Sequence, residues 1–211
     1  MPSSVPIDYS FQGDGILSVK TAMERDFQAL KELSTYEKPL LRVWQYERPS
    51  ITYGYFTPID KLLTDEAYCH FDIAKRPTGG GILFHMGDCC FSFAVPASSS
   101  WYSESIEENY ARINNWLLDR LGMGSGGEKP SQTSAREYCQ ANSTKYDVIY
   151  CGKKIAGCAE RKTKSGFLHQ CALFLEEPDW TLIERALYNG KEVVALMKEQ
   201  LNFIKGDIIW Q

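Results

Sequence analysis

Apolar side chains recur every three or four positions in two long stretches of the chain. One stretch covers residues 15–34, with charged residues on the opposite side, and the other covers residues 104–121 and ends at Gly122. A period near 3.6 residues places apolar side chains on one face of a helix, and glycine commonly follows a helix end. The pattern therefore predicts two amphipathic helices, each packed against a core.

Other stretches are short, apolar and rich in β-branched or aromatic residues, which is typical of strands. Residues 40–46 and 51–55 are separated by a turn-like segment with Pro49, and we expect them to form a hairpin. Gly54 in the second run indicates either a bulge, a close approach of a ligand, or a simple strand end. Further strands are predicted at residues 72–74, 89–95, 146–150, 154–159 and 167–175.

The last part of the chain predicts two short helices, at residues 179–188 and 191–201, before an apolar end at 208–210. The sequence has no internal repeat and no clear linker. We therefore expect a single α+β domain over residues 1–211, with a mixed β-sheet, packed helices and no separate C-terminal accessory domain.

Composition narrows the class of partner. The chain has 211 residues, of which 44% are hydrophobic, and a net charge of -4. This charge does not favour general binding to nucleic acid or to an anionic membrane surface. No apolar run approaches the roughly 20 residues that span a bilayer, and no basic-then-apolar leader begins the chain. We expect a cytoplasmic protein with a specific partner.

The cysteines and histidines argue against a disulfide framework or a structural zinc site. The seven cysteines are an odd number, and two of them are adjacent in a predicted strand. No C-x-x-C pair occurs, and the three histidines lack metal-ligand spacing. Reduced thiols fit a cytoplasmic location.

The segment Arg76-Pro77-Thr78-Gly79-Gly80-Gly81 is the most distinctive chemical feature. Successive glycines expose backbone N–H groups where no Cβ blocks a ligand, so the segment could cradle an anion. It is not a Walker loop, because the glycines lead into a strand-like run rather than into Lys-Ser/Thr and a helix. A glycine-rich hairpin or bulge is the alternative. A second glycine-rich stretch, at 122–135, predicts a mobile loop.

An ordered set of motifs resembles the lipoate-protein ligase and octanoyltransferase family, which shares its catalytic fold with biotin-protein ligases. The motifs are found in the following segments: 41–44, Pro49, 53–56, 76–81 with His85, 152–159 and 167–169. The resemblance covers about residues 15–190. It implies attachment of a lipoyl or octanoyl group to one lysine of a lipoyl domain, in the E2 component of 2-oxoacid dehydrogenases or in the glycine-cleavage H protein.

The resemblance also assigns site residues. Arg76 and the loop Thr78, Gly79, Gly80 and Gly81 match positions that contact the acyl chain and the phosphate. Lys154 matches the essential lysine, whose positive charge would stabilise the negative charge of the transition state. A solvated hairpin lysine is the alternative. The remaining matches to acyl- or adenylate-binding positions are His85, Asp147, Gly157, Ala159 and His169.

Two mechanisms compete within the family. A ligase uses ATP and Mg²⁺ with lipoate or octanoate to make an acyl-adenylate, whereas a transferase passes octanoyl through a thioester on a cysteine and needs no cofactor. Cys139 lies at the spacing from Lys154 at which a transferase subfamily keeps its nucleophile. The triple glycine and Asp147 favour the ligase. Because the glycine motif is the stronger match, the ligase is the mechanism that the sequence predicts. A separate accessory subunit would fit single-domain ligases.

Three positions depart from the family pattern near the proposed site. Met86 stands where aspartate usually follows the histidine, Gln170 replaces the second of two paired histidines, and Cys171 replaces a glycine. These changes could retune acyl specificity or remove activity. A protein that binds lipoyl domains without acylating them is therefore a further hypothesis.

Overall fold

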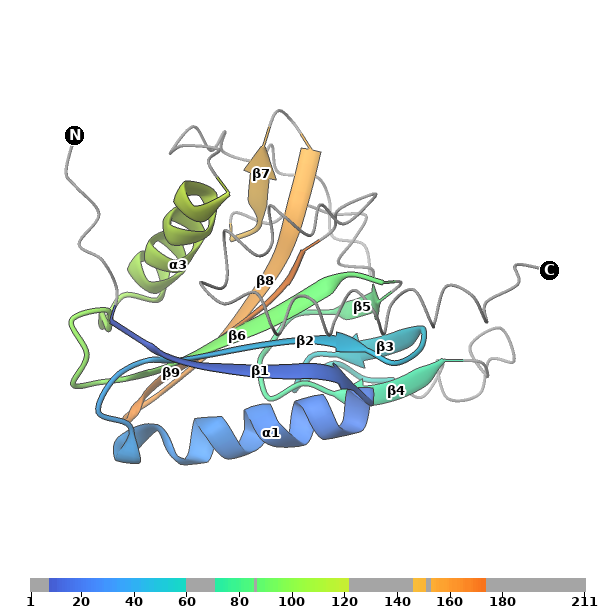
Figure 1. Cartoon of the computed structure of the whole chain (residues 1–211), viewed down its shortest axis with the longest axis horizontal. Helices are drawn as coiled ribbons and strands as arrows, with labels where there is room; N and C mark the ends of the chain where they lie inside the picture. Colours follow the sequence, from blue (N-terminus) through green and yellow to red (C-terminus); the bar gives the residue numbers. More distant parts are fainter. Residues whose placement is uncertain (1–7, 60–70, 86, 122–145, 151–152, 174–211) are drawn as a thin grey trace.

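The computed structural model describes residues 8–59, 71–85, 87–121, 146–150 and 153–173 (Figure 1). Within them, one sheet has six strands in the order β1-β2-β6-β9-β8-β7, and a second has three in the order β4-β3-β5. The bounds in the large sheet are β1 Ser10–Leu17, β2 Leu40–Tyr46, β6 Cys89–Pro96, β7 Val148–Tyr150, β8 Lys153–Thr163 and β9 Gly166–Leu173. Those in the small sheet are β3 Ser50–Tyr53, β4 Asp72–Lys75 and β5 Ile82–His85.

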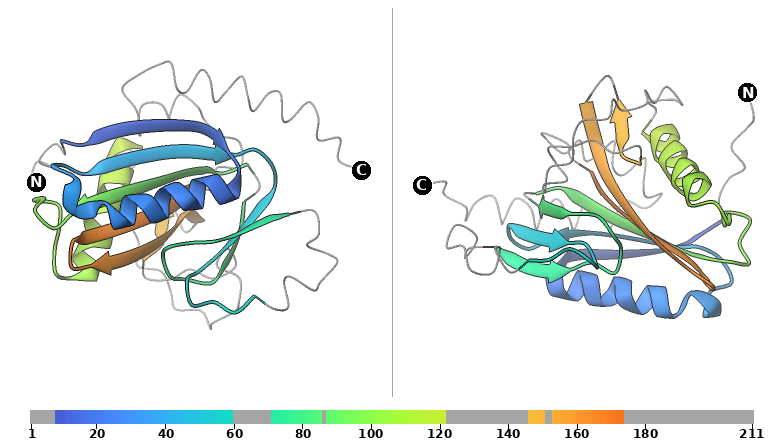
Figure 2. Two further views of the ribbon diagram at one scale, coloured as in Figure 1. Left: turned by 90° about the horizontal axis from the view of Figure 1, so that it is seen from below. Right: turned by 180° about the vertical axis from the view of Figure 1, so that it is seen from behind.

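Two helices cover opposite faces of the large sheet (Figures 1 and 2). Helix α1, Val19–Lys31, begins at the N-cap Ser18, whose hydroxyl accepts from Thr21 N, and a short 3₁₀ turn, Leu33–Thr35, follows it. It connects β1 to β2, which are parallel, as a crossover helix between parallel strands does. Helix α3, Ile106–Arg120, lies on the other face and is capped by Ser105.

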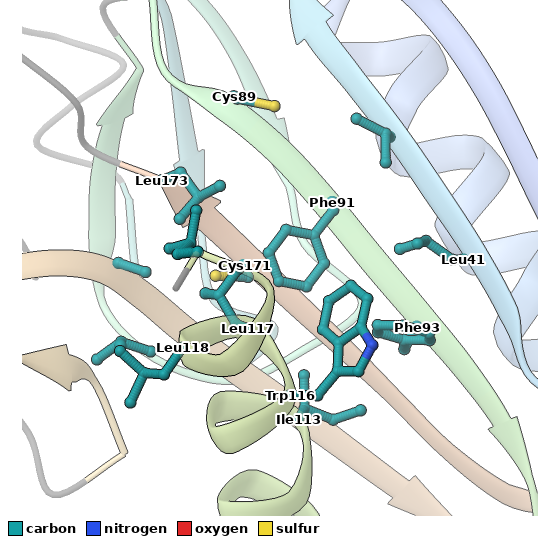
Figure 3. Packing of buried hydrophobic residues seen from close by; sticks show 14 of the residues in the cluster. Leu41, Cys89, Phe91, Phe93, Ile113, Trp116, Leu117, Leu118, Cys171 and Leu173 are labelled. Atoms are coloured by element: carbon teal, nitrogen blue, oxygen red, sulfur yellow. The ribbon is translucent and has the colours of Figure 1, made fainter. Parts of the chain in front are cut away.

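The main core lies between α3 and the large sheet (Figure 3). Trp116 of α3 packs edge-on against Phe91 and Phe93, with ring centroids 6.1 and 4.8 Å away. Alternate residues of a strand face opposite sides of a sheet. The neighbours of these phenylalanines, Cys90 and Ala94, accordingly pack on the α1 side.

A buried polar network ties α1 to the large sheet. Arg42 Nε donates to Asp14 Oδ2 at 2.8 Å, and its Nη1 contacts Asp26. Asp26 also accepts hydrogen bonds from Ser92 Oγ at 2.7 Å and Gln170 Nε2 at 2.5 Å. Burial raises the pKa of Asp26, and the Arg42 guanidinium opposes that rise. Buried charges of this kind need such partners to remain in the interior.

The structure confirms the α+β class and most predicted elements, with two corrections. The expected hairpin of residues 40–46 and 51–55 is wrong, because β2 pairs with β1 and β6 while β3 pairs with β4 and β5. The helix predicted from residue 15 begins at Val19, since Gly15 and Ile16 belong to β1, which the sequence pattern missed. Polar and apolar residues alternate only weakly in β1, so its last residues were assigned to the helical pattern that follows.

Several predictions concern residues outside the described ranges. They are the glycine-rich loop at 122–135, Cys139, Met86, and the elements predicted beyond residue 173. Neither described helix has the length and apolarity to cross a membrane.

Candidate active site

The glycine segment and Lys154 line one cavity. The cavity has a volume of about 320 Å³ and is bounded on one side by the small sheet and on the other by β8 and β9. The predicted site residues in its wall are Arg76, Gly79, Gly80, His85, Asp147, Lys154, Gly157 and Ala159. Thr78, Gly81 and His169 are outside the lining. A volume of this size falls at the lower end of the range for small-ligand pockets.

The segment from Thr78 to Gly81, here called the glycine turn, packs closely on the end of β3. A Cβ added at Gly54 would lie 1.8 Å from the Gly80 carbonyl oxygen, so only glycine fits there. Gly80 has φ +90°, a conformation that glycine adopts without strain. A Cβ at Gly79 would meet nothing within 4 Å. Gly54 thus makes room for the turn backbone, and Gly79 and Gly80 of the turn line the cavity.

Arg76 holds the glycine turn in shape. Its Nη2 donates to the carbonyl oxygens of Gly79 at 3.1 Å and Gly81 at 2.9 Å, and its Nη1 donates to Thr52 Oγ1 at 2.8 Å. The side chain is buried but also lines the cavity. The planar guanidinium therefore braces the turn from inside while placing a fixed positive charge at the cavity wall.

A chain of hydrogen bonds continues from Arg76 to a carboxylate. Thr52 Oγ1 lies 2.7 Å from His85 Nε2, and His85 Nδ1 lies 2.7 Å from Asp88 Oδ2. Arg76 can only donate to Thr52, so the Thr52 hydroxyl can donate to Nε2 in the tautomer in which Nδ1 donates to Asp88. In this tautomer each hydrogen bond of the series, from Arg76 through Thr52 and His85, donates in the direction of Asp88. Asp88 was not singled out from the sequence, because the expected partner directly follows the histidine at position 86.

Lys154 is paired inside the cavity wall. Its Nζ lies 3.0 Å from Asp147 Oδ2, and the two side chains are 10% and 4% exposed. Asp147 also accepts the backbone N–H of Cys158 at 3.3 Å, which fixes the carboxylate against β8. This burial excludes the alternative of a solvated hairpin lysine. The arrangement can hold an ammonium group in a defined place where water is scarce.

Residues 18–199 match the family described as the lipoyl protein ligase A/B catalytic domain. The chain belongs to this family. Curated relatives include the octanoyltransferase LipM of Lysinibacillus sphaericus, 25% identical over 176 residues, which are 77% of this chain and 64% of the relative. The LipM protein of Bacillus subtilis is 25% identical over 178 residues, 78% and 63% of the two chains. The chain thus spans slightly less than two thirds of the length of these relatives.

Solved structures share the fold of the lipoyl ligase family. The T. acidophilum protein Ta0514 with bound lipoic acid has a TM-score of 0.54 at 20% identity, covering 90% of this chain and 83% of that one. A lipoate-protein ligase A bound with ATP has a TM-score of 0.55 at 19% identity, with 94% and 85% covered. At these identities the likeness concerns the fold alone.

An ATP-dependent reaction in this family would bring Mg²⁺ and a nucleotide to the site. Among the described residues, one group has the spacing of metal ligands, namely His85, Asp88 and Cys90, whose ligand atoms all lie within 4.8 Å of one another. Imidazole and thiol donors do not match Mg²⁺, which prefers oxygen ligands. The glycine turn, by contrast, suits a phosphate, because its backbone is unobstructed at Gly79.

His169 lies behind the cavity, on the side of α3. It is fully buried, its ring meets Tyr110 edge-on at 5.1 Å, and its Nδ1 is 3.5 Å from Glu160 Oε2. Burial lowers the pKa of His169, but the Cys158 thiol and Glu160 outweigh it and raise the pKa to about 9. His169 is therefore a charged residue next to the cavity and does not line it.

Several lining residues were not among the predicted site residues. Tyr110 and Tyr146 stack at 4.3 Å, and Trp44 and Tyr46 form an aromatic wall on the α1 side. Cys158 and Glu160 follow Lys154 at alternate positions of β8. Residues two apart face the same side of a strand, so Lys154 gave a signal for Cys158 and Glu160, although Gly157 and Ala159 of the other face also line the cavity. The aromatic residues gave no such signal.

Proposed function

We propose that this chain transfers an octanoyl or lipoyl group to a lysine of a lipoyl domain. The observation that supports the proposal is the convergence of Lys154 with Gly79 and Gly80 on one cavity of about 320 Å³. The acyl carbonyl would sit between the lysine and the glycine turn, with the chain running along the small residues Gly157 and Ala159. The apolar inner wall, including Met23 and Leu83, suits a hydrocarbon chain.

In this proposal Lys154 stabilises the charge that develops on the acyl oxygen. A nucleophile that attacks the carbonyl makes a tetrahedral centre with a negative oxygen, and a preorganised cation at that position lowers the barrier. The 3.0 Å contact with Asp147 keeps the Lys154 ammonium oriented before the substrate arrives. Removing one such stabilising group typically costs about 100–1000-fold in rate.

The similarity to LipM proteins favours the cysteine-dependent mechanism over the ligase that the glycine motif alone had favoured. The Cys139 thiolate would attack the octanoyl thioester of a donor carrier and release the carrier thiol. The acceptor lysine amine would then attack the new Cys139 thioester, form the amide, lose a proton and release the thiolate. Donor and acceptor would be lipoyl or acyl carrier domains, including those of 2-oxoacid dehydrogenase E2 and the glycine-cleavage H protein.

ATP-dependent ligation is the second candidate. It is favoured by the open backbone at Gly79, which suits a phosphate, and by the fixed charge of Arg76 at the cavity wall. Here lipoate or octanoate would react with ATP to give an acyl-adenylate and pyrophosphate, and the lysine would displace AMP.

Mass spectrometry of a lipoyl domain distinguishes these mechanisms. The domain is incubated with the full-length protein and either an octanoyl carrier protein, or ATP, Mg²⁺ and octanoate. Transfer predicts an octanoyl mass increment with the carrier as donor, lost in Cys139→Ser. Ligation predicts the increment with ATP and free acid, retained in Cys139→Ser. Binding of the lipoyl domain without an increment in either mixture would overturn acyl transfer and leave the binding-only hypothesis.

A further inference from the structure

Two cysteines face each other across neighbouring strands in the cavity wall. Cys158 of β8 is directly opposite Cys171 of β9 in the antiparallel ladder, so both side chains project from the same face. Their sulfur atoms are 3.4 Å apart, both residues line the cavity, and neither is in a disulfide. Neither thiol has a role in the proposed acyl transfer.

The register of the two strands is compatible with a disulfide. Directly opposite residues in an antiparallel pair have Cα atoms about 4.5–5.5 Å apart, and disulfides span about 4.4–6.8 Å. The two sulfur atoms have to close from 3.4 Å to a bond of about 2.05 Å.

The surroundings give the two thiols different chemical character. The hydrogen bond between the Cys158 and Cys171 thiols lowers the pKa of Cys158, and His169 adds to this effect against the opposing effect of burial. Burial raises the pKa of Cys171. A thiolate is the nucleophile in thiol–disulfide exchange, so Cys158 is suited to attack first and Cys171 to resolve the product.

The other described cysteines lack this combination. Cys90 also lines the cavity, but its thiol faces the Asp88 carboxylate at 3.5 Å, and burial with that charge raises its pKa. Cys89 is outside the lining, and burial raises its pKa to about 12. Among the four described cysteines, exchange should therefore be selective for the pair on β8 and β9.

We propose that Cys158 and Cys171 form a reactive dithiol, which a small disulfide entering the cavity converts into a disulfide bond between β8 and β9. The Cys158 thiolate attacks one sulfur of the small disulfide, whose S–S bond breaks and releases a thiolate that takes up a proton. The Cys171 thiol then loses its proton and attacks the Cys158 sulfur, which displaces the second thiol. The small disulfide is reduced to two thiols and the cysteine pair is oxidised.

This chemistry has a consequence for the acyl ligand. A chain that ends in a cyclic disulfide, as the lipoyl group does, meets an exchangeable dithiol in the wall, whereas a plain eight-carbon chain does not. This second step rests on the proposed function, because it requires the cavity to admit an acyl chain. The reaction of the pair with a neutral small disulfide does not depend on it.

Peptide mapping tests the dithiol directly in the full chain. The reduced protein is treated anaerobically with 2-hydroxyethyl disulfide, remaining thiols are alkylated, and the protein is digested with trypsin. Cleavage after Arg161 and Lys164 puts Cys158 and Cys171 on separate peptides, so a linked pair of peptides reports the bond. We expect this linked species to form well before Cys89 is modified. Absence of the linked species, or equal modification of Cys89, would overturn the proposal.

Single variants separate the two roles, with Cys89→Ser as the matched control. In Cys171→Ser the mixed disulfide at Cys158 should persist, because its resolving thiol is gone. In Cys158→Ser the thiol at 171 should remain unmodified, and Cys89→Ser should behave as the unaltered protein. A mixed disulfide at position 171 in Cys158→Ser would contradict the assignment of Cys158 as the attacking thiol.

Octanoic acid and lipoic acid test the link to the acyl cavity. Octanoic acid in excess should slow formation of the linked peptides several-fold, and lipoic acid alone should produce them. If the neutral disulfide links the pair while neither acid has an effect, the dithiol stands and the acyl cavity of the proposed function is refuted.

Discussion

The Thr78 hydroxyl donates a hydrogen bond of 2.5 Å to Gln170 Oε1, which joins the glycine turn to the middle of the large sheet. Gln170 in turn donates from Nε2 to Asp26 at 2.5 Å. The glutamine therefore connects the turn to the buried charges beneath α1. The departure from the family pattern at position 170 has a structural role in this chain.

Thr78→Val should destabilise the fold and loosen the turn. The substitution keeps the shape but leaves the buried Gln170 oxygen without its donor, which typically costs about 1–3 kcal/mol. Urea unfolding measures the loss. Thr57→Val is the control, since Thr57 Oγ1 donates to the Gly80 carbonyl of the same turn at 2.6 Å but in an exposed position. An equal loss in both variants would contradict the importance of the Gln170 contact.

Lys154→Met should lose acyl transfer by about 100-fold or more, because the cation beside the acyl oxygen is gone. Both side chains of the Lys154–Asp147 pair are nearly buried, and breaking a buried pair from one side can cost about 3–5 kcal/mol. Stability must therefore be measured beside activity, by thermal unfolding and the lipoyl-domain mass assay.

Combining Lys154→Met with Asp147→Leu separates the two effects. Removing both charges should recover much of the stability that Lys154→Met loses, while activity stays low. Activity that returns with stability would show that Lys154 acts only through the fold.

Two glycines of the site should differ in how strongly substitution by alanine affects stability. Gly54→Ala places a Cβ against the Gly80 carbonyl, and we expect a loss of about 1–3 kcal/mol from forced backbone movement. Gly79→Ala places its Cβ in open space, so stability should change by less than about 0.5 kcal/mol. If a ligand approaches the turn backbone, Gly79→Ala should nevertheless weaken ligand binding, which calorimetry with octanoate can measure.

His169 should remain protonated through neutral pH. The Cys158 thiol and Glu160 raise its pKa to about 9 against the effect of burial, and an NMR titration of the imidazole should find that value. Glu160→Gln should lower it by removing the neighbouring negative charge. A wild-type pKa near the ordinary value of about 6.5 would contradict the assignment.

The two shifted groups at this place have opposite effects on stability. His169 has a raised pKa, so its contribution is complete below about pH 6.5 and is lost as the pH rises through about 9. Cys158 has a lowered pKa, so its contribution is present above the unfolded-state pKa and is lost as the pH falls through the folded-state pKa. Cys158→Ser removes this contribution and also the largest cause that raises the pKa of His169, so an NMR titration of His169 in this variant should give a pKa below about 9.

Local patterns predicted the elements that have strong periodicity. β2 matched its predicted range because a run rich in aliphatic and aromatic residues ends at the turn-like segment with Pro49, and α3 was marked by its stripe and by Gly122. Pairing was harder to infer, since β2 and β3 are close in sequence but belong to different sheets. The hairpin is absent because β2 pairs with β1 and β6, whereas β3 pairs with β4 and β5.

The candidate site was predictable where a residue type has one obvious chemical use. The glycine turn and Lys154 were found from motifs, and the structure places both at the cavity. Asp88 was not singled out, and Gln170 was noted only as a departure from the family pattern, because their roles depend on side-chain hydrogen bonds to His85 and Thr78 that the folded structure forms. Such contacts join residues by tertiary packing and leave no local pattern.

The glycine turn extends from the small sheet, whereas Lys154 belongs to the large one (Figure 1). Each sheet completes its own ladder of backbone hydrogen bonds, so the ladders do not fix the width of the gap between them. A ligand that contacts both walls of the cavity therefore holds the two sheets together. A bound ligand should therefore stabilise the fold. The midpoint temperature of thermal unfolding should be higher with the ligand than without it.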